Sequence, residues 1–363
     1  MRERILDILQ CPECGGVMAL TAFQSNGVEI SSGILHCSEN HYFPVHKGIP
    51  RMLPNSLRDY WSDIKNDVPE PMPATVSLLI ESGSFEDAGK AFDSPTKANF
   101  SNEWDNHDIG GKTWTMELRD RIQWFFLDPL RIPKEELNGK MMLDAGCGNG
   151  SQSVAYTEFG LEVVALDLST GLEKGQAFRD VHPTAKPENV HFVQADLQNP
   201  PLLPNSFDII HSAGVLHHTP DTLKTFSALR PLLKSGGTFY VWLYKFEKIV
   251  TRIVNSLRAV TTRIPAPIFA RVADMTSVPF MGFCWSVNKL GIRNYEIPTQ
   301  REAALAVHDI FGAPYAHYHN FEEVSGWYKS SGFTEIWDCN DGRRGFGVCG
   351  RLPANGTELG HNA

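Results

Sequence analysis

The chain has 363 residues, of which 42% are hydrophobic and 21% charged, as in water-soluble globular proteins. Its length suits one large domain with a small accessory unit. The net charge of −9 disfavours a general nucleic-acid binder, because phosphate backbones require clustered Lys and Arg. No apolar run approaches the roughly 20 residues that cross a bilayer, and the N-terminal sequence lacks the apolar core of a signal peptide. We therefore expect a cytoplasmic protein.

Residues 1–55 form a unit rich in Cys and His. Two strand-like segments, 17–23 and 28–35, separate a C-x2-C knuckle from a C-x3-H pair, and a hairpin between them would bring the two pairs together. Four nitrogen and sulfur ligands at this spacing predict a closed, structural Zn²⁺ site. His36 and His46 are alternatives for the fourth ligand. The predicted metal ligands are Cys11, Cys14, Cys37 and His41.

Residues 56–84, with the sequence PEPMP at 69–73, are expected to be a linker. Apolar residues at helical spacing from Trp114 onward predict a helix around 115–128. From residue 140 short apolar runs alternate with helix-like segments, which indicates a parallel sheet flanked by helices. Residues 353–363 resemble a disordered tail. The expected strands are 141–146, 162–168, 190–197, 207–214 and 238–244, followed by a helix over 321–332 and two last strands.

A glycine-rich turn, DAGCGNG at 144–150, ends the first of these strands and opens a helix. Its G-x-G-x-G spacing differs from the G-x-G-x-x-G of dinucleotide-binding proteins. Asp144, just before the glycines, would repel a pyrophosphate but suits a ligand with an ammonium group. Asp167 closes the second strand, where a carboxylate can accept both hydroxyls of a ribose, and Asp196 follows the third, where it can meet an adenine amine. All three acids lie at the carboxyl edge of the expected sheet.

This set of motifs resembles the class I S-adenosylmethionine (SAM)-dependent methyltransferases of the ubiquinone/menaquinone type, over roughly residues 140–244 and the last strands. The resemblance implies a Rossmann-like α/β fold with a seven-stranded sheet whose last strand is antiparallel. It places the methyltransferase domain over 85–352, with a cap insertion at about 245–320. The cofactor-binding residues that it implies are Asp144, Gly146, Cys147, Gly148, Gly150, Asp167, Leu168, Asp196, Leu197 and Ser212.

The segment after the fourth strand, 214–220, resembles the part of these enzymes that faces both the sulfonium and the acceptor. Histidine is the natural general base near neutral pH, so His217 is the predicted base. His317 and His319, in an aromatic segment before the resumed helix, are alternatives. Cys147 is expected to be a packing residue and not a nucleophile.

The stretch 245–293 carries eight Lys and Arg residues against two acids. Apolar residues at helical spacing among these charges, beginning with Ile249 and Ile253, predict a basic amphipathic helix. Three interpretations stay open. The stretch is a lid with a solvated basic face, a site for an acidic substrate, or a peripheral contact with an anionic membrane.

The N-terminal unit resembles the zinc-ribbon activator subunit of eukaryotic tRNA and protein methyltransferases, and the zinc module of bacterial 23S rRNA guanine methyltransferases. That resemblance raises RNA methylation as the alternative function. Charge argues against it, because residues 1–60 hold five Lys and Arg against six Asp and Glu. We therefore expect methyl transfer from SAM to an O, N or C atom of a small, partly hydrophobic molecule. A non-catalytic scaffold subunit is a further alternative, and the oligomeric state stays open.

Overall fold

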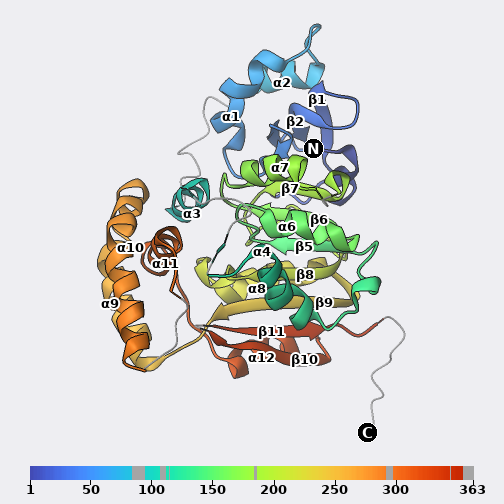
Figure 1. The fold of residues 1–363 in the computed structure, drawn as a ribbon. Coiled ribbons are helices and arrows are strands. Elements are labelled where there is room, and N and C mark those ends of the chain that lie inside the picture. Colours follow the sequence, from blue (N-terminus) through green and yellow to red (C-terminus); the bar gives the residue numbers. More distant parts are fainter. Residues whose placement is uncertain are drawn as a thin grey trace.

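The structure is a computed structural model, which describes residues 1–83, 95–106, 112–113, 115–183, 186–291, 297–343 and 345–354. Trp114, Arg293 and the expected tail from residue 355 onward lie outside the described residues. A small N-terminal sheet sits at one end of a large central sheet, and a helical cap lies along the side of the molecule (Figure 1).

The central sheet has seven strands in the order β10-β11-β9-β8-β5-β6-β7. The strands β5 to β9 are parallel, and β11 runs antiparallel to β9 and to β10. The expected seven-stranded, Rossmann-like fold is thereby confirmed, and each expected strand is present within a few residues of its predicted bounds. The strands are β5 (Met141–Ala145), β6 (Glu162–Asp167), β7 (Val190–Gln194), β8 (Phe207–Ala213), β9 (Leu233–Tyr244), β10 (Glu335–Arg343) and β11 (Gly345–Arg351).

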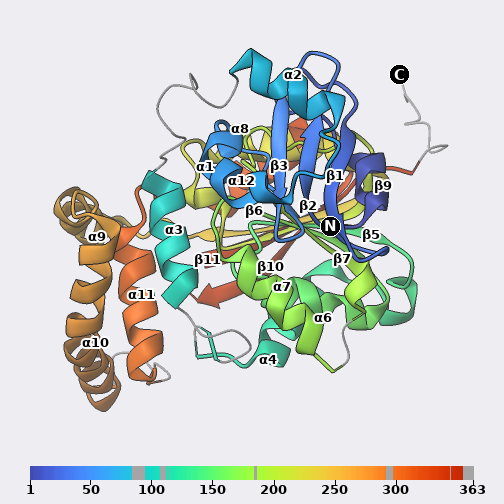
Figure 2. The same ribbon diagram turned by 90° about the horizontal axis from the view of Figure 1, so that it is seen from above.

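Both faces of this sheet are buried, as its near-continuous apolar strands require. Alternate residues of one strand enter opposite cores: Leu143 belongs to one hydrophobic cluster and Met142 to the other. The helices α4, α6 and α7 lie on one side of the sheet, whereas α8 and α12 lie on the other (Figure 2). The helix expected around 115–128 is confirmed as α4, one π-helical turn (Gln123–Leu127) and α5. The bounds are α4 (Leu118–Ile122), α5 (Asp128–Leu130), α6 (Ser151–Tyr156), α7 (Leu172–Val181), α8 (Thr222–Leu229) and α12 (Phe321–Ser330).

The N-terminal module is an antiparallel four-stranded sheet in the order β1-β2-β3-β4. The predicted hairpin is confirmed as the antiparallel pair β1 and β2. The segment expected to be a linker is folded instead: it carries α1 and α2, and Leu57 and Ile64 of α1 pack with Ile34 of the sheet. Helical spacing of these apolar residues outweighs the polar composition of the segment. The elements are β1 (Ala19–Ser25), β2 (Ile30–His36), β3 (Tyr42–His46), β4 (Ile49–Pro50), α1 (Ser56–Ile64) and α2 (Ala74–Ser82).

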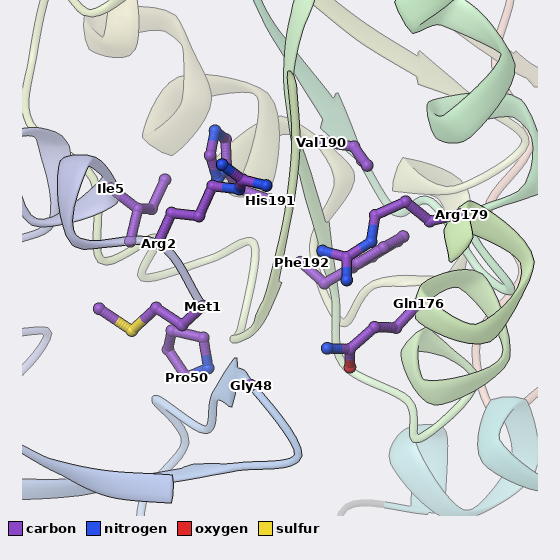
Figure 3. Close-up of a pocket in the computed structure, with 10 residues that line it drawn as sticks. All are labelled: Met1, Arg2, Ile5, Gly48, Pro50, Gln176, Arg179, Val190, His191 and Phe192. Carbon is purple, nitrogen blue, oxygen red and sulfur yellow. The ribbon is translucent and has the colours of Figure 1, made fainter. Parts of the chain in front are cut away.

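The module and the central sheet form one structural unit. Side chains from the module, including Ile5, Leu9 and Phe43, belong to the same hydrophobic cluster as Leu143 of β5. In Figure 3, Met1 and Pro50 of the module face Arg179 of α7 across a cavity of about 10 Å³, which has room for at most one water. The module therefore packs tightly on the edge of the sheet formed by β7.

Ion pairs cross this interface. The fully buried guanidinium of Arg51 lies 2.8 Å from Glu173 of α7, and the exposed ammonium of Lys47 lies 2.7 Å from the same carboxylate. Burial raises the pKa of the Glu173 carboxyl, but the bonds from Lys47 and Arg51 outweigh burial and hold this pKa below its usual value. Arg51 also stacks over the Tyr60 ring, at 4.8 Å from its centroid.

We expect Glu173→Ala, which leaves the Arg51 charge buried without its carboxylate, to lower the free energy of unfolding by about 3–5 kcal/mol. The matched control is Lys47→Ala, which removes the exposed partner of the same carboxylate and should cost at most about 0.5 kcal/mol. Urea denaturation followed by circular dichroism measures both losses. Equal small losses in the two variants would contradict the role of the buried pair.

The cap consists of three helices that follow β9, in the region expected to be an insertion. The expected amphipathic helix is confirmed as α9, which lies with α10 on the outer side of α11 at the edge of the molecule (Figure 2). Helix α3, from the segment before the central sheet, packs against α10 and α11. No helix in the described ranges is both long and apolar enough to cross a bilayer. The bounds are α3 (Pro95–Asn106), α9 (Lys248–Thr261), α10 (Ala266–Lys289) and α11 (Gln300–Gly312).

Candidate active site and metal centre

The four predicted metal ligands of the module lie together. Their ligand atoms are all within 4.8 Å of one another. The Sγ atoms of Cys14 and Cys37 are 3.7 Å apart, and His41 Nδ1 lies 3.5 Å from Cys11 Sγ and 3.4 Å from Cys37 Sγ. Tetrahedral Zn²⁺ with bonds of about 2.3 Å to sulfur and 2.0 Å to nitrogen requires separations of about 3.5–3.8 Å between its ligand atoms. The donor set and its spacing therefore fit Zn²⁺.

The two alternative histidines lie elsewhere. His36 Nε2 contacts the Thr21 hydroxyl at 3.4 Å, and the His46 ring stacks on Tyr60 at 5.2 Å between centroids. Both are outside the cluster, so the structure favours His41 as the fourth ligand.

A cavity of about 900 Å³ opens at the carboxyl ends of the parallel strands, beneath the cap. This volume is near the upper end of the roughly 300–1,000 Å³ typical of small-molecule sites. Its floor comes from the turns that follow β5, β6, β7 and β8, and its roof from α3, α10 and α11. Much of the lining is aromatic or apolar, as with Phe100, Phe125, Val215, Trp242 and Phe280.

Six of the ten residues expected to bind the cofactor line this cavity, and the other four, Asp144, Gly148, Gly150 and Ser212, do not. Asp167, at the end of β6, accepts hydrogen bonds from the backbone N–H groups of Gly148 and Ser169, both at 2.8 Å. These bonds fix the carboxylate at the cavity wall and leave lone pairs for a ligand hydroxyl. Burial raises the pKa of Asp167. The lining residues among the ten are Gly146, Cys147, Asp167, Leu168, Asp196 and Leu197.

Asp144 and Ser212 hold the floor of the site instead of lining it. Ser153 donates to one oxygen of Asp144 at 2.5 Å, and His211 Nδ1 lies 3.3 Å from the other. Ser212 donates to the Ala145 carbonyl at 2.8 Å. The ammonium-binding role expected of Asp144 therefore finds no support in its position, because Asp144, unlike Asp167, does not line the cavity.

The glycines of the turn allow close packing against α3 and against the neighbouring strand β7. Gly148 has φ +58°, and a Cβ there would lie 2.6 Å from the indole of Trp104 in α3. Gly150 has φ +71°, and a Cβ there would meet Phe192 at 2.5 Å. Burial raises the pKa of the neighbouring Cys147 thiol well above its usual value, so this thiol is protonated and acts as a packing group.

Arg121 of α4 lines the same cavity, and sequence reasoning missed it. Its side chain is buried, and burial lowers its pKa to about 10, so it is still charged at neutral pH. Within the described residues its Nε has no hydrogen-bond partner, and no carboxylate lies within ion-pair distance of its guanidinium. The sequence did carry a signal for Arg121, because this residue shares the apolar face of its helix with Leu118, Ile122 and Phe125. A cation on such a face needs an anionic partner, which indicates a binding role.

The two adjacent histidines after β8 have different surroundings. The ring of His217 is fully buried and lies 4.0 Å from Tyr244 between centroids, and it is absent from the residues that line the cavity. Burial lowers the pKa of His217 well below its usual value. A neutral imidazole without access to the cavity cannot take a proton from an acceptor there. The assignment of His217 as the base is therefore not supported by its position.

His218 does line the cavity. Its Nδ1 lies 2.8 Å from the Tyr315 carbonyl, and because a carbonyl only accepts, Nδ1 carries the proton in this bond. Its Nε2 lies 3.4 Å from Asp309 of α11. Burial raises the pKa of Asp309, but the bond and charge of His218 and the bond from Tyr244 outweigh burial and hold the pKa of this carboxyl below its usual value. Asp309 is thus an ionised partner for His218.

The alternative bases lie outside the cavity lining as well. His317 Nε2 contacts the Thr219 carbonyl at 3.1 Å, and His319 lies 3.0 Å from Glu323 and 3.1 Å from Thr222. His317 thus ties the segment after α11 to the turn that follows β8, and His319 ties it to the start of α8. None of the three predicted histidines lines the cavity, whereas His218, which sequence reasoning missed, does.

Comparison with known proteins agrees with this geometry. A family model described as "Methyltransferase domain" matches residues 143–241. The chain is 32% identical over 119 residues to a ubiquinone biosynthesis O-methyltransferase of Xanthomonas campestris, covering 32% of this chain and 49% of that protein. It is 25% identical over 179 residues to the tRNA U34 carboxymethyltransferase of Idiomarina loihiensis, covering 47% and 50%.

Among solved structures, the chain is similar to phosphoethanolamine N-methyltransferase 2 of Haemonchus contortus, in a complex with phosphomonomethylethanolamine and S-adenosylhomocysteine. The TM-score is 0.44 at 16% identity, with 76% of this chain and 59% of that chain covered. The chain spans about half the length of the curated relatives that it matches.

Proposed function

Because this chain contains a class I SAM-dependent methyltransferase domain, we propose that the protein transfers the methyl group of SAM to an O, N or C atom of a small, partly hydrophobic acceptor. The observation that carries the proposal is the single cavity beneath the cap. It joins the cofactor edge, with Asp167 and Asp196, to the pair of His218 and Asp309. Its volume and aromatic lining suit two small molecules side by side.

SAM supplies an activated methyl group on its sulfonium. The residues of the chain therefore have to bind the two substrates, align them and remove a proton from the acceptor. Asp167 would hold the ribose hydroxyls, Asp196 the adenine amine and Arg121 the methionine carboxylate. As the acceptor atom forms its bond to carbon and the sulfonium–carbon bond breaks, His218 Nε2 would take the acceptor's proton. Asp309 would stabilise the imidazolium that results.

We expect Arg121→Gln to weaken SAM binding by about 1.5–3 kcal/mol, roughly 10- to 100-fold, because a charged hydrogen bond to the carboxylate is lost. The matched control is Arg119→Gln, an exposed residue of the same helix, which should bind SAM as the wild type does. Calorimetric titration measures both. Methylthioadenosine, which lacks the carboxylate, should bind Arg121→Gln and wild type equally. A wild type that binds no SAM would overturn the proposed function.

The acceptor class is tested with SAM that carries a radiolabelled methyl group. The enzyme is incubated with a lipid extract and, separately, with total RNA. Label in a lipid-soluble small molecule supports the proposal, and label in RNA alone would overturn it.

RNA methylation has little support from charge. All five Lys and Arg residues of positions 1–60 are in ion pairs, so the module presents no free basic patch to a phosphate backbone. The partners are Glu29 for Arg2, Glu162 for Arg4, Glu173 for both Lys47 and Arg51, and Asp59 for Arg58. We propose instead that the module, with structural Zn²⁺, stabilises the edge of the central sheet.

A further inference from the structure

Helix α9 is amphipathic with its apolar face turned outward. Ile249 is 73% exposed and Val260 65%, although both are large aliphatic side chains. The opposite face of the helix is buried and polar, with Thr251 and Arg258 directed into the cap. The exposed apolar residues of this helix are Ile249, Val250, Ile253, Leu257 and Val260.

Hydrogen bonds fix this orientation of the helix. Arg258 donates to the carbonyls of Ile310 at 2.7 Å and of Ala313 at 2.5 Å, at the end of α11. Thr261 donates to the Phe311 carbonyl at 2.6 Å. Rotating the apolar stripe inward would break these three bonds and expose the buried guanidinium. The outward apolar face is therefore built into the fold.

Helix α10 extends the same apolar surface. Its inner residues, among them Phe269 and Ala273, pack against α11, whereas its outer residues are exposed. Met275 is 78% exposed. Monomeric soluble proteins seldom expose so many large apolar side chains in neighbouring helices. The exposed apolar residues of α10 include Ile268, Met275, Val278, Phe283 and Trp285.

The charges around this surface are mostly basic, with Glu247 and Asp274 as the acids. Lys248 and Arg252 flank the stripe of α9, and Arg271 lies on the outer side of α10; all three are exposed. Lys289 Nζ lies 4.9 Å above the Trp285 ring, a pairing that suits the boundary between headgroups and acyl chains. The stretch 245–293 has a net charge of +6, whereas the whole chain has a net charge of −9. The remainder of the chain is therefore acidic.

We propose that the α9–α10 hairpin docks on the surface of an anionic lipid bilayer, with its apolar stripe inserted at the level of the acyl chains. An outward apolar stripe flanked by Lys and Arg is the pattern of interfacial helices, which combine apolar burial with attraction to anionic headgroups. A second copy of the chain fits less well, because a twofold contact would place one basic surface against another.

The hairpin connects this surface to the site. Phe280 of α10 lies on the inner side and lines the cavity, while Met275 and Val278, within about one and a half turns along the helix, face outward. The docked cap therefore lies between the bilayer and the acceptor site. Resting on the proposed function, this placement indicates an acceptor that partitions into membranes.

Vesicle flotation of the full chain tests the proposal, without SAM, on phosphatidylcholine–phosphatidylglycerol vesicles and on phosphatidylcholine alone. We expect binding to the anionic vesicles that weakens with salt. Ile253→Gln with Leu257→Gln, which leaves charge unchanged, should reduce this binding roughly tenfold or more. Lys248→Gln with Arg252→Gln should reduce it about 10- to 30-fold.

The matched control is Asn255→Gln, an exposed residue on the polar side of the same helix, which should bind as the wild type does. SAM titration of each variant separates the docking proposal from the proposed function. A variant that loses vesicle binding but still binds SAM has lost docking alone. No binding to anionic vesicles at low salt would overturn docking. Docking would also be overturned if sedimentation showed that the wild type is a dimer and that the variant Ile253→Gln with Leu257→Gln is a monomer.

Discussion

His218→Ala is expected to lower kcat by about 10²- to 10⁴-fold while SAM affinity stays within about twofold of wild type, the pattern of a lost general base. The proton on Nδ1 is held by the Tyr315 carbonyl, so a base at this position acts through Nε2, which lies 3.4 Å from Asp309 and has to be unprotonated before the transfer. Asp309 can stabilise the imidazolium that forms. The measurement uses the acceptor fraction that radiolabelled SAM identifies, with and without added imidazole.

Imidazole should restore part of the turnover of His218→Ala, because the vacated space opens on the cavity. It should not alter the wild type. Asp309→Asn should lower kcat by about 10- to 100-fold, because His218 is still present but lacks its ionised partner. The matched control is His217→Leu, whose buried ring lacks access to the cavity and whose loss should change kcat less than about threefold. A His217→Leu variant as inactive as His218→Ala would contradict the assignment.

His41→Gln is expected to release the metal and unfold the N-terminal module. Structural zinc contributes about 10–16 kcal/mol of apparent binding free energy in small zinc domains, so the loss of one of four ligands costs about 3 kcal/mol or more. Metal analysis should find one Zn²⁺ per chain in the wild type and little in the variant. Because Ile5, Leu9 and Phe43 share a hydrophobic cluster with the central sheet, the loss should also lower the unfolding midpoint of the whole chain.

The matched control is His36→Gln, which changes a histidine adjacent to a ligand but outside the cluster. It should keep its zinc and its unfolding midpoint. Retention of zinc by His41→Gln together with its loss from His36→Gln would reverse the assignment of the fourth ligand.

Local patterns in the sequence predicted most of the framework. Apolar runs separated by glycine turns predicted the five parallel strands, because strand and turn preferences act over a few residues. The same reasoning placed Asp167 and Asp196 at the strand ends that line the cavity. The C-x2-C and C-x3-H pairs predicted a cluster, since each pair needs only a tight turn. The linker prediction for 56–84 differs from the structure, because the apolar partners of α1 lie in a sheet that is remote in sequence.

The sequence by itself therefore determined the sheet, its acidic edge and the metal cluster, all of which depend on short-range periodicity and spacing. Only the tertiary structure pointed to His218 in place of the predicted His217. A rotation of one residue in a short turn selects which ring meets Asp309, a residue 91 positions further along the chain. It also brought Arg121 and Trp104, from helices ahead of the sheet, to the cavity, with Trp104 against Gly148 of the glycine turn. The outward apolar face of α9 was likewise fixed by long-range bonds of Arg258. Periodicity shows that a helix has an apolar face, whereas packing decides which way that face points.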